Sequence, residues 1–294
     1  MGRETGITWC DHTFNPWHGC EKISPGCKNC YAASTDKRWG GENWGKDAPR
    51  RMMSDAYWRQ PMNWAAAARA AGVRRRVFCA SMADVFERRD DLVAPRERLW
   101  GLIAATVDAL DWLLLTKRPE NAGAMVPWGP FGVTPAQWLA GERESMVQTE
   151  PWPNVWGGVT TENQDEADRR LVHILGDETR PRTVDFAVTF ASYEPALGPV
   201  IFDGSAGGRN WLDAPALDWI IAGDESGTGR RPASLEWFRS VRDQIARAGG
   251  RAGFHFKQWC GPDADGLGGD RVKGKIHLPV LDGAVHDAGP MGHQ

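Results

Sequence analysis

Short, continuous apolar runs recur along the chain. They cover Gly6–Trp9, Val77–Ala80, Trp112–Leu115, Val155–Val159, Phe186–Phe190, Trp219–Ala222 and Phe254–Phe256. Runs of this length without regular polar alternation are typical of strands that are buried on both faces of a parallel sheet. The pattern therefore predicts a series of parallel strands.

Helical patterns lie between these runs. The alanine-rich stretch Met62–Ala71 predicts one helix, and Pro95 can begin another whose apolar stripe continues to Leu110. Asn163–Leu175 has acidic residues early and arginines later, which suits the helix dipole. Ser234 can cap a further helix with an apolar face up to Ile245.

The alternation of strands and helices predicts an α/β fold. We expect a (βα) barrel, partial or complete, rather than an open dinucleotide-binding sheet, because no Gly-x-Gly-x-x-Gly follows a strand. Residues 1–294 are predicted to form a single domain. The segments Trp39–Arg51 and Pro127–Pro153, rich in Trp, Gly and Pro, are expected to be loop insertions, and a Gly/Asp-rich tail begins at Gly261.

Polar residues follow each apolar run. They include Asp84, Lys117, Arg118, Thr161, Glu162, Asn163, Ser192, Glu194, Glu225, Lys257 and Gln258. The carboxyl ends of parallel strands meet on one side of the sheet, where ligand sites form. Helix capping is the alternative explanation for Asn163 and Asp84, but it explains the lysines and glutamates poorly. The sequence therefore predicts a polar cavity of mixed charge.

Composition and charge limit the class of protein in which this cavity is expected. The chain of 294 residues is 41% hydrophobic and 25% charged, as in ordinary globular proteins, and its net charge of −3 argues against a globally basic nucleic-acid-coating protein. Most of the 16 tryptophans are expected to pack in the core. No apolar stretch is long enough to span a membrane, and the N-terminus lacks a signal-peptide pattern. We therefore expect a cytoplasmic protein, in which clustered cysteines bind metal more often than they form disulfides.

Three cysteines form the most informative motif. Cys20, Cys27 and Cys30 have the spacing Cys-x6-Cys-x2-Cys within a predicted loop, residues 10–31, that follows the first strand. A tight turn at Ser24–Gly26 can bring them together. Three thiolates can hold three irons of a [4Fe–4S] cluster and leave the fourth iron open to a ligand.

A closed metal site is the competing interpretation. His12 or His18 could complete a structural Cys3His zinc site, and Cys10 could close an iron–sulfur cluster as a fourth ligand. The absence of a second Cys-x2-Cys favours iron. Cys79 and Cys260 are expected to be isolated thiols.

The assembled motifs resemble those of the phage Gp37/Gp68 protein family, a group similar to radical S-adenosylmethionine (SAM) enzymes. The matching blocks are Phe14–Cys20, Ser24–Ala32, Leu115–Pro119, Val155–Val159, Ser192–Pro195, Glu225–Gly227 and Phe256–Trp259. The resemblance covers nearly the whole chain and implies a radical SAM-like barrel that binds a [4Fe–4S] cluster through Cys20, Cys27 and Cys30, together with SAM. The cysteine spacing departs from the Cys-x3-Cys-x2-Cys of most radical SAM enzymes, and Asp224 and Cys260 stand where glycine is expected.

The resemblance implies reductive cleavage of SAM to a 5′-deoxyadenosyl radical, which abstracts hydrogen from a substrate. The expected cofactor contacts are Tyr31, Asp84, Thr161, Glu162, Asn163 and Ser192. The expected catalytic residues are Lys117, Glu194, Glu225 and Lys257, with Arg118 and Gln258 toward the substrate.

Lys117 and Arg118 suit a phosphate, so a nucleotide or DNA base is a candidate substrate, although pairing of these cations with Glu194 or Glu225 is an equal alternative. The expected partner is an electron donor such as flavodoxin or ferredoxin. The second hypothesis is a nucleic-acid-binding module with a structural zinc or a closed cluster.

Overall fold

The computed structural model describes residues 5–226, 229–259, 271–272, 275–276 and 280–290. The chain divides into two compact units. Unit 1 comprises Met1–Ile23, Cys30–Gly157 and Thr183–Ala187, and unit 2 comprises Ser24–Asn29, Gly158–Arg182 and Val188–Gln294. In the described part, no helix combines the length and apolar character that a membrane span requires.

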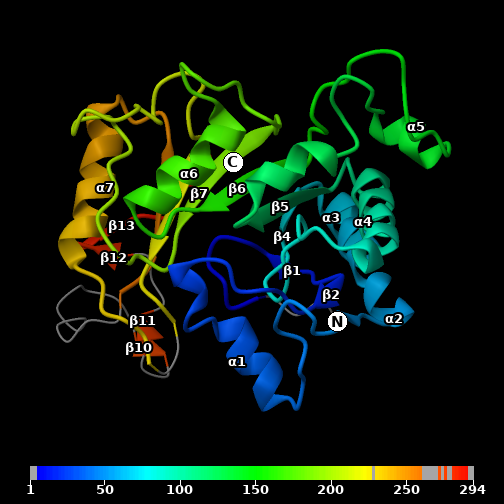
Figure 1. Cartoon of the computed structure of the whole chain (residues 1–294), viewed down its shortest axis with the longest axis horizontal. Helices are drawn as coiled ribbons and strands as arrows, with labels where there is room; N and C mark the ends of the chain where they lie inside the picture. The colour runs from blue at the N-terminus through cyan, green and yellow to red at the C-terminus, as the bar shows by residue number, and fades with distance from the viewer. Residues whose placement is uncertain (1–4, 227–228, 260–270, 273–274, 277–279, 291–294) are drawn as a thin grey trace. The chain divides into compact units, whose positions relative to one another are not determined.

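Unit 1 is built around parallel strands. Its strands are β1 (His12–Thr13), β2 (Trp17–His18), β3 (Arg51–Met52), β4 (Arg75–Cys79) and β5 (Leu110–Thr116). Its helices are α1 (Tyr31–Arg38), α2 (Asp55–Trp58), α3 (Gln60–Ala71), α4 (Val93–Ala105) and α5 (Pro135–Leu139). β1 pairs with β4 and β4 with β5, all in parallel, and α3 packs against α4 (Figure 1). β2 and β3 form a short antiparallel pair.

Unit 2 is also built around parallel strands. Its elements are α6 (Gln164–Leu175), β7 (Val188–Tyr193), β8 (Trp219–Gly223), α7 (Leu235–Arg247) and β9 (Gly253–Gln258), followed by β10 (Arg271–Val272), β11 (Lys275–Ile276), β12 (Val280–Leu281) and β13 (Ala284–Val285). β7 pairs with β8 and β8 with β9 in parallel. The strand β6 (Val155–Thr160) belongs to both units, because their division falls after Gly157.

The main sheet has seven strands in the order β1-β4-β5-β6-β7-β8-β9, and the described pairings between them are parallel. Its central strands β6, β7 and β8 are buried along their whole length. This burial explains why they read as continuous apolar runs. The predicted α/β class with a parallel sheet is confirmed.

Three predicted boundaries were wrong. Residues Gly6–Trp9 form a turn, with the Thr5 hydroxyl accepting from the backbone N of Ile7, and β1 lies at His12–Thr13 inside the predicted loop 10–31. The helix expected to reach Leu110 ends at Ala105. There Thr106 turns its hydroxyl back to the carbonyls of Leu102 and Ile103, so Leu110 begins β5 instead.

The third boundary concerns β7, which begins at Val188 rather than Phe186. Phe186 instead packs in unit 1, where its ring lies 5.8 Å from Trp128 and 6.5 Å from Phe86. The helices expected at Met62–Ala71, Asn163–Leu175 and from Ser234 are confirmed, with small extensions. Most tryptophans are buried, as predicted, and the insertion Pro127–Pro153 holds a cluster of them around Trp152.

Candidate functional site

The predicted site residues are divided between the two units. Unit 1 contains Cys20, Cys30, Tyr31, Asp84, Lys117 and Arg118, and unit 2 contains Cys27, Thr161, Glu162, Asn163, Ser192, Glu194, Glu225, Lys257 and Gln258. Cys20, Cys27, Cys30 and Cys79 are free thiols. Cys260, and most of the predicted tail from Gly261, lie outside the described residues.

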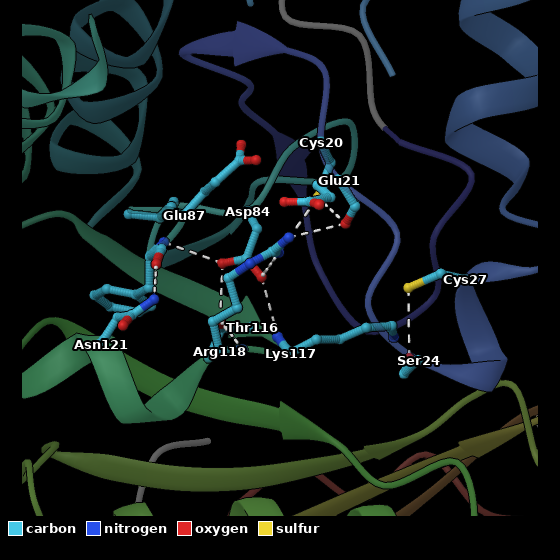
Figure 2. Close-up of polar contacts among 12 residues, drawn as sticks. Cys20, Glu21, Ser24, Cys27, Asp84, Glu87, Thr116, Lys117, Arg118 and Asn121 are labelled. Atoms are coloured by element: carbon cyan, nitrogen blue, oxygen red, sulfur yellow. Dashed lines mark hydrogen bonds and ion pairs between the residues drawn. The ribbon is translucent and has the colours of Figure 1, made fainter. Parts of the chain in front are cut away.

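Arg118 links a carboxylate to a cysteine of the motif in unit 1. Its Nη1 lies 3.5 Å from Cys20 Sγ and 3.1 Å from Asp84 Oδ2, and its Nη2 donates to the carbonyl of Glu21 at 2.8 Å (Figure 2). The side chains of Arg118 and Asp84 are almost completely buried. A buried arginine therefore donates N–H groups to one motif sulfur and to the backbone beside it.

Asp84 is saturated by protein donors. Its Oδ1 accepts from the Thr116 hydroxyl at 2.7 Å and from the backbone N of Phe86 at 3.0 Å, and its Oδ2 accepts from the backbone N of Lys117 at 3.1 Å. Asp84 follows β4, and Thr116 to Arg118 end and follow the neighbouring strand β5, so their meeting agrees with the expected convergence of strand ends. The carboxylate orients Arg118 (Figure 2).

Burial raises the pKa of the Cys20 thiol to about 12, and the nearby Asp84 carboxylate acts in the same direction. The Arg118 guanidinium opposes both effects. Cys30 stands at the N-cap of α1 and is partly exposed. Tyr31, the first residue of that helix, donates its hydroxyl to the carbonyl of Ser81 at 2.8 Å.

In unit 2, a buried carboxylate holds the turn between the first and second motif cysteines. Glu162 Oε1 accepts from the Ser24 hydroxyl at 2.6 Å, and its Oε2 accepts from the backbone N of Gly26 at 2.5 Å. A Cβ on Gly26 would lie 2.3 Å from the Glu162 carboxyl carbon, so the contact requires glycine. The Ser24 hydroxyl also lies 3.4 Å from Cys27 Sγ (Figure 2).

A second carboxylate holds the other end of this turn. Glu225 is buried and accepts from Asn29 Nδ2 at 3.0 Å, from the backbone N of Arg231 and from the Arg231 guanidinium. Arg231 in turn donates to the carbonyl of Pro25 at 3.0 Å. Although its burial acts in the opposite direction, these donors keep the pKa of Glu225 below its usual value.

Arg170 balances the charge of Glu162. Its side chain is fully buried, and Nη1 lies 3.2 Å from Glu162 Oε1 and 2.7 Å from the carbonyl of Thr160. Its Nη2 pairs with Glu166, one turn earlier on α6, at 2.8 Å. Glu162 thus belongs to a buried ion network that supports the cysteine turn.

The remaining predicted residues of unit 2 have several roles. Lys257 Nζ binds both oxygens of Glu194, at 2.5 and 2.7 Å, in a half-buried pair. Gln258 Nε2 donates to the Ser226 hydroxyl at 2.6 Å and to the carbonyl of Asp224. Neither of these contacts joins the cysteine turn.

Asn163 caps helix α6, because its side chain accepts from the backbone N of Glu166 at 3.0 Å. Helix capping was the alternative explanation for this residue. Ser192 is buried on β7, and its carbonyl accepts from the backbone N of Thr161. The Thr161 side chain is completely buried, and its hydroxyl has no hydrogen-bond partner among the described residues.

The zinc interpretation finds limited support in the histidines. His18 Nδ1 lies 2.7 Å from Arg51 Nη2, and the pKa of His18 is lowered by burial and by that guanidinium. His12 stacks on Trp64 with a centroid distance of 4.3 Å. Across the described residues, no three His, Cys, Asp or Glu side chains are grouped closely enough to hold one metal ion.

Sequence reasoning missed the residues that hold the others in place. Arg170 was assigned only to the helix dipole, Ser24 only to a turn and a matching block, and Thr116 only to the matching block Leu115–Pro119. Arg231 and Asn29 were not singled out. Ser24, Asn29 and Thr116 each contact a residue from a distant segment, so no local pattern marks them. The nearest signal for Arg170 is its spacing of four residues from Glu166.

Comparison with known proteins identifies a protein family. No curated protein and no solved structure matches the chain. One family model matches residues 4–290, and its description is "Protein of unknown function (DUF5131)". Because the match covers nearly the whole sequence, the chain belongs to the DUF5131 family.

Proposed function

We propose that this protein is an iron–sulfur enzyme in which Cys20, Cys27 and Cys30 hold a [4Fe–4S] cluster that acts on S-adenosylmethionine. The observation that carries the proposal is the construction around the motif. Its thiols are free, while the turn Ser24–Asn29 is held by two buried carboxylates, Glu162 and Glu225. Because a buried carboxylate is costly unless its oxygens are hydrogen-bonded, these bonds hold the turn at a defined position.

The donor chemistry fits such a cluster. Thiolates are the usual ligands of iron–sulfur clusters, and hydrogen bonds to their sulfurs tune them. Cys20 Sγ already has a guanidinium donor from Arg118, and Cys27 Sγ lies beside the Ser24 hydroxyl. The ligands of a four-iron cube each bind a different iron and so stand farther apart than the ligands of one ion.

Cys20, Cys27 and Cys30 would hold the cluster, which, once reduced by an external donor, would supply one electron for the reductive cleavage of SAM and so for hydrogen abstraction from a substrate. The chain's own residues provide position and charge. Arg118 fixes the sulfur of Cys20 and the adjacent backbone, and Glu162 and Glu225 fix the turn that bears Cys27. The Lys257 ammonium holds a proton at Nζ against Glu194, at the ends of β9 and β7. This pair is the proposed site of proton handling.

The wider setting follows from the same proposal. We assign the fold to a partial, radical SAM-like barrel and the family to relatives of the phage Gp37/Gp68 proteins. Electrons would come from a donor such as flavodoxin or ferredoxin, the substrate class would be a nucleotide or a nucleic acid, and the reducing cytoplasm would suit the free thiols.

Anaerobic reconstitution tests the proposal. Protein incubated with iron and sulfide should bind about four irons and four sulfides per chain. With SAM and dithionite it should then release 5′-deoxyadenosine, measured by chromatography. One zinc per chain without iron would support a structural metal site instead. A loaded cluster that yields no 5′-deoxyadenosine with any reductant or candidate substrate would remove the SAM step while retaining the cluster.

Removing the Arg118 guanidinium should lower the reduction potential of the reconstituted cluster. Arg118→Gln deletes an N–H donor to Cys20 Sγ, and such donors stabilise the reduced, more negative cluster. One hydrogen bond of about 1 kcal/mol corresponds to about 40 mV for a one-electron couple. Potentiometric titration followed by electron paramagnetic resonance gives the shift.

Arg96→Gln is the matched control for this experiment. Arg96 is also a buried arginine, but it donates to the carbonyls of Val85 and Glu87, and among the described residues it has no hydrogen bond to a cysteine. Its loss should leave the potential unchanged. An equal shift in both variants would mean that the potential responds to general loosening of the structure and not to the bond with sulfur.

A further inference from the structure

Trp39 is an exception among the tryptophans. Its side chain is 61% exposed, whereas the other 15 tryptophans are buried or half-buried. Leaving a large aromatic ring in water forgoes about 2 kcal/mol of burial free energy. An exposed ring of this size is therefore a candidate contact surface.

The backbone that carries Trp39 is fixed. Trp39 caps the C-terminus of α1, and its backbone N donates to the carbonyl of Asp36 at 3.0 Å. The buried Asp36 carboxylate accepts from both the backbone N and the side-chain amide of Asn43, at 3.1 and 2.8 Å. These bonds close the loop 39–43 against the helix, so the indole is presented on an ordered support.

A buried imidazole lies beside the exposed ring, and a guanidinium is bonded to that imidazole. The rings of Trp39 and His18 are stacked, with centroids 6.2 Å apart and an interplanar angle of 28°. His18 is buried and bonded to Arg51 at 2.7 Å, and these two residues are register partners in the β2–β3 pair. One face of the indole is thus supported while much of the ring remains open to solvent.

The exposed charges in the segments of unit 1 that flank Trp39 are mostly positive. In the unit 1 segments between Trp17 and Met52, the exposed basic residues are Lys22, Lys37, Arg38, Lys46 and Arg51, and the exposed acidic residues are Glu42 and Asp47. The whole chain, by contrast, has a net charge of −3. Arg50 and Asp36 of the same segment are buried and engaged with other residues.

We propose that the surface formed by Trp39, Lys37, Arg38 and Arg51 binds single-stranded nucleic acid, with a base stacked on Trp39 and phosphates on the three cations. A flat aromatic face combined with cations is the chemistry that recognises unpaired bases and their backbone. Duplex DNA would not fit equally well, because its bases are already stacked on each other. The inference does not depend on the iron–sulfur proposal.

Fluorescence anisotropy with a labelled 12-nucleotide oligothymidylate tests the proposal on the full, metal-free chain. Trp39→Ala should weaken binding about tenfold, the range found for loss of one stacked base. Arg38→Gln should reduce the dependence of log affinity on log salt by about 0.7, because one phosphate contact is lost. Phe131→Ala is the matched control, since Phe131 is an aromatic residue of unit 1 with 69% exposure outside this surface.

Three results would overturn the proposal. These are no binding at low salt, equal affinity of Trp39→Ala and the parent protein, or equal loss in Phe131→Ala. Polyglutamate of similar length is the competitor that distinguishes an acidic protein partner. If it displaces the oligonucleotide and binds more tightly, the surface is a site for acidic proteins. Thermal unfolding of Trp39→Ala should match the parent, because the ring is exposed.

Discussion

Replacing Cys27 with alanine is expected to abolish iron binding in the reconstituted protein. With one of three thiolates removed, the remaining two cannot hold a four-iron cube, so iron should fall from about four per chain to a small fraction of that value. The same result is expected for Cys20→Ala and Cys30→Ala. Iron and sulfide analysis with absorption spectroscopy after anaerobic reconstitution gives the measurement.

Cys79→Ala and Cys10→Ala are the controls for this series. Both are buried cysteines outside the Cys-x6-Cys-x2-Cys motif, and burial alone raises the pKa of Cys79 well above its ordinary value. Cys79→Ala should retain the full iron content. Loss of iron in Cys10→Ala would show that a fourth thiolate closes the cluster, and this would remove the proposed binding position for SAM. Retention of iron in Cys27→Ala would contradict the ligand assignment itself.

Glu162→Gln is expected to destabilise the protein by about 3 kcal/mol and to impair iron retention. The substitution leaves the buried Arg170 short of one counter-charge, and breaking a buried ion pair costs 3–5 kcal/mol. The lower end of this energy range applies because Glu166 still pairs with Arg170. The new amide also places N–H groups near the backbone N of Gly26 or near Arg170, which are donors themselves. Chemical denaturation followed by circular dichroism measures the loss.

Asp168→Asn provides the matched control for this stability measurement. Asp168 is an exposed carboxylate on the same helix, α6, and its Oδ1 accepts from Gln164 Nε2 at 3.0 Å. Its change should shift the free energy of unfolding by less than about 0.5 kcal/mol. Comparable losses in the two variants would contradict the role of a buried ion network.

Gly26→Ala tests the importance of the position of the turn while leaving the ion pair between Glu162 and Arg170 in place. A methyl group at this position would lie 2.3 Å from the Glu162 carboxyl carbon, so the turn must shift while Glu162 and Arg170 keep their charges. We expect reduced iron retention with a smaller loss of stability than in Glu162→Gln. Gly208→Ala is the control, because a Cβ there meets nothing within 4 Å. Full iron retention in Gly26→Ala would mean that the position of the turn does not matter for the cluster.

The sequence predicted the order of strands and helices because each signal was local. β6, β7 and β8 are buried throughout and therefore appear as apolar runs, and Asn163 caps α6 with the residue type expected there. The errors arose where tertiary packing overrode a local pattern. Phe186 extends an apolar run but packs beside Trp128, and Leu110 continues a helical stripe but begins β5.

The candidate site was predictable in its residue types and much less so in its contacts. Strand-end polarity predicted Asp84, Glu162 and Glu225 as residues of a polar cavity, and the structure buries all three. Their contacts differ from the expected ones. Asp84 orients Arg118, and Glu162 and Glu225 hold the cysteine turn. The carboxylate oxygens of all three residues therefore accept hydrogen bonds from other groups of the protein. The proposed pairing of Arg118 with Glu194 or Glu225 is replaced by its pair with Asp84.

By itself, the sequence determined the alternation of strand and helix, the burial of the central strands and the spacing of the three cysteines, because periodicity and spacing are properties of neighbouring residues. Only the tertiary structure decided which donor each buried acid accepts from. Glu162 and Gly26 are 136 residues apart, and Asn29 and Glu225 are 196 apart. A hydrogen bond has a range of about 3 Å, so its partners are set by how distant segments pack, and no local pattern encodes that.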